Sequence, residues 1–82
     1  MTRIYTIGLE NRTEKEGAYL VVQVAHRDST RAARIAMKEA GQRGGRWHVV
    51  HLAQRRTSLR VPEGEVMGAS GPYTFTLDHE EN

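Results

Sequence analysis

The stretch GRWHVVHLAQRR, residues 45–56, contains two histidines three positions apart, which is the first place to look for chemistry. Imidazole nitrogens bind zinc and other transition metals, and two histidines at helical spacing can hold one ion. Here the histidines follow two glycines and alternate with Trp, Val and Leu, a pattern typical of a β-strand. Residues three apart on a regular strand point to opposite faces, so His48 and His51 could share an ion only at a bulge. We therefore expect no metal site.

Motifs for nucleophilic catalysis and phosphate binding are also missing from the sequence. Ser29 is better explained as a helix cap, and GASG at 68–71 lacks the following helix of a nucleophile elbow. GQRGG at 41–45 lacks the Gly-Lys-Ser/Thr that ends a phosphate loop. With no cysteine, the chain has neither a thiolate zinc site nor a cysteine nucleophile. We expect no enzymatic activity and no cofactor.

The first elements that would position these residues are two strands. Residues 3–9 alternate, with Tyr5, Ile7 and Leu9 on one face. Residues 18–26, AYLVVQVAH, are apolar on both faces, which indicates a central strand. The connection between them is polar and ends in Gly17, so we expect an antiparallel hairpin.

The apolar period then changes to that of a helix over residues 27–41. Asp28 or Ser29 can cap its start, and Gly41 can end it. A helical projection puts one apolar set toward the core: Ala33, Ala36, Met37 and Ala40. It puts a basic set on the opposite side: Arg31, Arg34 and Lys38.

The rest of the chain again has strand patterns. We expect a third strand at 46–54, a short fourth at 57–61, a Gly- and Pro-rich loop at 62–71, a last strand at 72–78, and a frayed acidic tail at 79–82. The order β-β-α-β-(β)-β predicts one α+β domain over residues 1–82. Its antiparallel or mixed sheet would have four to five strands, with one helix packed on one face.

A net charge of +2 conceals a strong asymmetry along the sequence. Residues 26–60 carry nine basic and two acidic groups, a net of +7, whereas residues 61–82 carry five acidic groups and no basic one. Ten of the twelve basic residues are arginines, whose planar guanidinium binds carboxylates or phosphates through paired hydrogen bonds. The candidate basic surface comprises Arg31, Arg34, Lys38, Arg43, Arg46, Arg55, Arg56 and Arg60. The alternative acidic surface comprises Glu63, Glu65, Asp78, Glu80 and Glu81.

Three interpretations of this asymmetry stay open. The arginines can be an ordinary solvated surface. They can neutralise phosphates of a nucleic acid, with Trp47 stacking on a base. They can also dock on a protein partner of opposite charge. A leader peptide and an apolar run of membrane-spanning length are both missing, so we expect a cytoplasmic protein with no membrane contact. The sequence leaves the oligomeric state open.

The succession of a capped helix, DSTRAARIAMKEAG, a glycine turn and an aromatic-led strand, GGRWHVV, resembles small phage and mobile-element proteins, and among them the anti-CRISPR inhibitors. The resemblance implies a non-enzymatic inhibitor in a bacterial host cell. Such a protein docks on a CRISPR effector complex and blocks the binding or cleavage of target DNA, sterically or by mimicry of DNA through the acidic surface. The alternative is a small basic nucleic-acid-binding module with a regulatory role.

Overall fold

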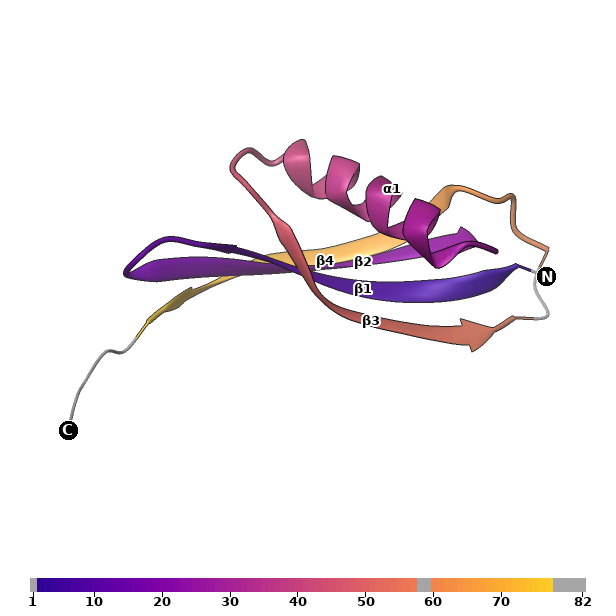
Figure 1. The fold of residues 1–82 in the computed structure, drawn as a ribbon, viewed down its shortest axis with the longest axis horizontal. Coiled ribbons are helices and arrows are strands. Elements are labelled where there is room, and N and C mark those ends of the chain that lie inside the picture. Colours follow the sequence, from indigo (N-terminus) through magenta and orange to yellow (C-terminus); the bar gives the residue numbers. More distant parts are fainter. Residues whose placement is uncertain (1, 58–59, 78–82) are drawn as a thin grey trace.

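A computed structural model describes residues 2–57 and 60–77 and contains four strands and one helix. The elements are β1 (Arg3–Arg12), β2 (Glu16–His26), α1 (Ser29–Gly41), β3 (His48–Arg56) and β4 (Glu65–Thr76). The strands form one sheet in the order β3-β1-β2-β4, and every neighbouring pair is antiparallel. α1 lies on one face of this sheet (Figure 1). The α+β class is confirmed, with an antiparallel sheet of four strands.

The hairpin of β1 and β2 forms the centre of the sheet and carries the core. Tyr5, Ile7 and Leu9 of β1 lie opposite Val24, Val22 and Leu20 of β2, all six on the helix side of the sheet. None of the six side chains is more than 2% exposed. The expected apolar face of β1 and the central position of β2 are therefore both confirmed.

α1 packs on this hairpin through a stripe of alanines. Ala32, Ala36 and Ala40 are fully buried, and their small side chains allow the helix to approach the sheet closely. The expected core face is rotated by about one residue position. Ala33 is only half-buried and Met37 is exposed, whereas Ile35 packs against the core. The rotation follows from the position of α1 over β1 and β2, which leaves Met37 beyond the edge of the contact.

β4 was only partly predicted. It starts at Glu65, so the residues from 65 to 71 lie in a strand where a loop was expected. A terminal strand makes ladder hydrogen bonds on one side only, so it tolerates Gly68, Gly71 and Pro72. Its register against β2 shifts twice, which gives these residues room. In the expected strand at 57–61, Thr57, Arg60 and Val61 lie outside any strand; residues 58–59, like Asp78 and the tail at 79–82, fall outside the described residues.

The face of the sheet that points away from α1, which no helix among the described residues covers, is here called the open face. Tyr19 lies over Gly8 on this face, because a Cβ atom at Gly8 would collide with the tyrosine ring. Phe75 lies over Gly17 in the same way. Aromatic rings laid over glycines shield the backbone of a half-exposed sheet, and this explains why the central hairpin contains glycine at these positions.

The buried alanine stripe gives the first testable prediction. Replacement of Ala36 by leucine adds three carbons where the helix touches the sheet, so we expect the free energy of unfolding to fall by about 1–3 kcal/mol in urea titration. The matched control is Ala33→Leu, at a half-buried position where open space lies beside the helix, and it should cost distinctly less. Equal losses for the two variants would contradict the packing described.

Candidate functional site

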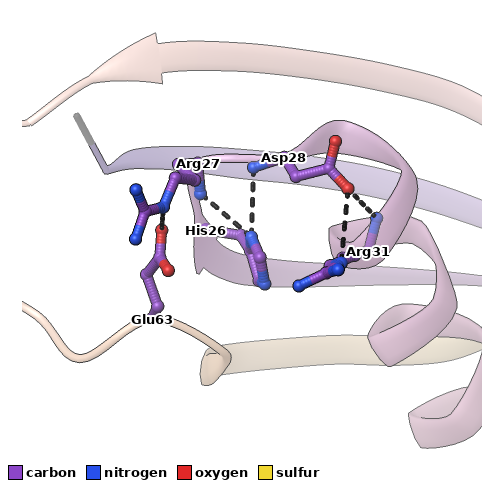
Figure 2. A network of polar contacts seen from close by, with 5 residues as sticks. All are labelled: His26, Arg27, Asp28, Arg31 and Glu63. Atoms are coloured by element: carbon purple, nitrogen blue, oxygen red, sulfur yellow. Dashed lines mark hydrogen bonds and ion pairs between the residues drawn. The ribbon is translucent and has the colours of Figure 1, made fainter.

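The corner between β2 and α1 contains a polar network that fixes the start of the helix (Figure 2). The Nδ1 atom of His26 accepts hydrogen bonds from the backbone N–H groups of Arg27 and Asp28, each at 3.0 Å. Asp28 then caps α1 by accepting a hydrogen bond from the backbone N–H of Arg31 at 3.0 Å. Because these contacts orient the helix, they also orient every side chain that it presents to solvent.

Two residues of the candidate acidic surface, Glu63 and Glu65, lie in the described part of the chain, and Glu63 belongs to the same corner. The Arg27 guanidinium donates to Glu63 at 2.9 Å and so ties the corner to the segment before β4. Glu65 is the first residue of β4 and lies opposite Ala25 of β2. The other members of the expected acidic surface, Asp78, Glu80 and Glu81, lie outside the described residues. The described acidic groups of that set are thus on the β4 side, and Glu63 is already paired.

The outer side of α1 forms a basic crest, defined as Arg31, Arg34 and Lys38. All three are exposed, on the side of the helix opposite the buried alanines, as expected from the sequence. Arg31 is 4.0 Å from the Asp28 carboxylate, and its side chain is 73% exposed. The side chains of Arg34 and Lys38 make no ion pair or hydrogen bond with any other described residue. Their charges are therefore available to a partner.

The remaining arginines of the candidate basic surface divide into two groups. Arg43 turns back onto α1, where it donates to the Glu39 carbonyl at 2.6 Å and to the Glu39 carboxylate at 3.2 Å, so it acts as a C-terminal cap. The other four are exposed, with Arg46 in the loop after α1, Arg55 and Arg56 at the end of β3, and Arg60 in the segment beyond. The structure does not bring all eight into one patch, but it gathers most of them along α1 and β3.

A groove separates α1 from β3, and it was not predicted from the sequence. It measures about 550 Å³ and is lined by Ser29, Thr30, Ala33, Arg34, Met37 and Leu52. The groove exists because α1 sits over β1 and β2 and leaves the helix side of β3 uncovered (Figure 1). Met37 and Leu52 are each 39% exposed and line the groove together, so they form a small contiguous apolar patch. The one sequence feature that could have indicated the groove is the position of Met37 at the margin of the alanine stripe.

The two histidines of β3 correct the expectation drawn from strand geometry. A bulge interrupts the pairing with β1, so that His51 lies opposite Gly8 and His48 lies opposite Glu10. Val50 is the extra residue, and both histidines consequently share the open face. The assumption that they point to opposite faces is wrong. Among residues 2–57 and 60–77, however, no group of three His, Cys, Asp or Glu side chains is placed to hold a metal ion.

Trp47 also differs from its expected role. Its ring is only 6% exposed and belongs to the core, and its indole N–H donates to the Gly44 carbonyl at 2.9 Å. A buried ring that supports the loop after α1 cannot stack on a nucleic-acid base. Trp47 therefore gives no support to the nucleic-acid interpretation.

The corner network gives a second prediction. His26→Ala leaves two backbone N–H groups without their acceptor, so we expect unfolding free energy to fall by about 1–3 kcal/mol. His48→Ala, on the exposed β3, should change it by less than about 0.5 kcal/mol. Chemical denaturation followed by circular dichroism measures both. If the two alanine variants are equally stable, His26 does not stabilise the turn between β2 and α1.

Comparisons with family models, with curated proteins and with solved structures find no match to this chain. Within the part of the chain that the structure describes, no helix has the length and apolarity to span a membrane.

Proposed function

We propose that this protein is a non-catalytic binding protein that docks its basic crest on an acidic surface of a protein partner. The proposal is carried by one observation: Arg34 and Lys38 are exposed on a rigid helix with no partner among the described residues. The backbone of α1 is already ordered by its cap and its packing, so binding has to order only the side chains of the crest. The field of these cations speeds association with an acidic partner.

The size of the crest favours a protein over a nucleic acid as the partner. Proteins that bind duplex DNA through its backbone typically neutralise about 6–10 phosphates. The crest offers three cations within about 11 Å, from Arg31 to Lys38, at about 1.5 Å of rise per residue. An apolar groove lies directly beside it, and such a surface matches the mixed apolar and charged surface of a protein better than a phosphate backbone.

The specific partner implied by the resemblance is a CRISPR effector complex, which the protein would inhibit in a bacterial cytoplasm. Complexes of the Cas9 type hold their guide–target duplex in a positively charged channel. A basic crest is repelled from such a channel, so docking occurs on an acidic surface elsewhere and blocks the complex sterically. Mimicry of DNA is less favoured, because the Glu63 carboxylate is already bonded to Arg27.

Charge reversal on the crest provides the third prediction. We expect the double variant Arg31→Glu, Lys38→Glu to weaken binding of the partner captured from the native host about tenfold, because two attractive pairs become repulsive. The matched control is Arg12→Glu, Lys15→Glu at the tip of the β1–β2 hairpin, which changes net charge equally and should leave binding unchanged. Titration calorimetry at two salt concentrations measures both. Equal weakening by the two variants would show a net-charge effect and contradict docking through the crest.

Two further assays define the partner class. Purified effector complex, guide and target DNA test inhibition directly: the wild-type chain should reduce target binding or cleavage, and the crest variant should inhibit less. A gel shift in low salt tests the nucleic-acid alternative, in which binding would weaken steeply as salt rises. We expect no shift; a shift lost in the crest variant would replace the protein partner with a nucleic acid.

A further inference from the structure

The two edges of the sheet differ in how well they can accept another strand. The β4 strand contains Pro72, which has no backbone N–H, so a regular ladder on its outer edge is interrupted there. The β3 edge has nine consecutive exposed residues without proline, and its single bulge, at Val50, lies in the pairing with β1. β3 is therefore the edge that can add a strand.

Side chains on the two faces of β3 differ in chemistry. On the helix side, Leu52 lies opposite Ile7 and faces the groove, where Met37 is its apolar neighbour. On the open face, Arg55 lies opposite Ile4, and His51 lies opposite Gly8. Gln54 and, at the end of the strand, Arg56 follow Leu52 on the helix side. Over the part of β3 beside the groove, an added strand would thus meet Val49 and Leu52 on one face and a cation and an imidazole on the other. Since residues of a strand alternate between faces, the matching sequence alternates apolar and acidic residues.

We propose that β3 and the groove bind an extended segment of the protein partner, in which apolar residues alternate with Asp or Glu, by adding it as a fifth strand. This inference rests on the proposed function in that the occupant belongs to a protein. The segment's backbone completes the hydrogen bonds of the β3 edge. Its apolar side chains cover Leu52 and Met37, and its carboxylates pair with Arg55 on the open face.

Charge argues against a second copy of this chain as the occupant. Residues 26–60 include α1 and β3 and carry a net charge of +7, from nine basic and two acidic groups. Two copies joined through β3 would bring two such regions together, with the Arg34 side chains at the margin of both grooves. Repulsion between like charges in a desolvated interface disfavours that arrangement, whereas an acidic segment is attracted.

The fourth prediction uses displayed peptides as the probe. Random heptapeptides on phage, selected against the full-length chain, should enrich sequences that alternate apolar residues with Asp or Glu. A bait carrying Arg55→Glu should shift the charged positions toward Lys or Arg, and it should bind the peptide selected on the wild type up to about fivefold more weakly. Nuclear magnetic resonance of the labelled chain should map the selected peptide to the β3 amides, and exchange of the amides on the outer edge should slow.

Matched variants on the two edges keep the test sharp. Leu52→Lys should abolish peptide binding, whereas Met67→Lys, at a β4 residue of the same exposure (40% against 39%), should retain it. The proposal is overturned by a selection that enriches nothing above empty beads, by peptides without acidic alternation, by equal losses at the two edges, or by β3 amides already protected through self-association. This readout uses no variant of Arg31 or Lys38, so failure of the crest and failure of the β3 site are distinguished.

Discussion

The close packing of three alanines against the central hairpin determines what the rest of the molecule presents to solvent. Ala32, Ala36 and Ala40 seat α1 over β1 and β2, and this contact leaves the helix side of β3 uncovered. With the alanines facing the sheet, the helix presents Arg31, Arg34 and Lys38 to solvent and places Met37 at the margin of the groove. The basic crest, the apolar groove and the unpaired edge of β3 thus all follow from the contact of α1 with β1 and β2.

The corner network makes this arrangement specific. A helix that packs through alanines has few large side chains to lock its direction, so its first turn must be fixed by other means. The His26 and Asp28 contacts supply this, and the pairing of Arg27 with Glu63 ties the corner to the chain before β4. The same ion pair neutralises Glu63, one of the described acidic groups on the β4 side.

The periodicity of apolar residues predicted those elements that bury one face. It did not predict features that depend only on how one strand pairs with another. The alternation of Tyr5, Ile7 and Leu9 and the apolar β2 predicted the central hairpin, because burial imposes those patterns. The sequence at the beginning of β4 predicts a loop, since Gly68, Gly71 and Pro72 usually end strands. The edge position that tolerates these residues depends on how the whole sheet is assembled. The bulge at Val50, which places His48 and His51 on one face, depends on register with β1 and leaves no local trace. The basic crest was predictable from helical spacing, but the groove depended on where the helix sits.

Binding through one side of the molecule, that of α1 and β3, is tested most directly by amide hydrogen exchange of the full chain with and without its captured partner. Bound partner should slow exchange at the outer edge of β3 and along α1, and leave β4 and the tip of the β1–β2 hairpin unchanged. Protection confined to β4 or to the central strands of the open face would contradict binding through α1 and β3.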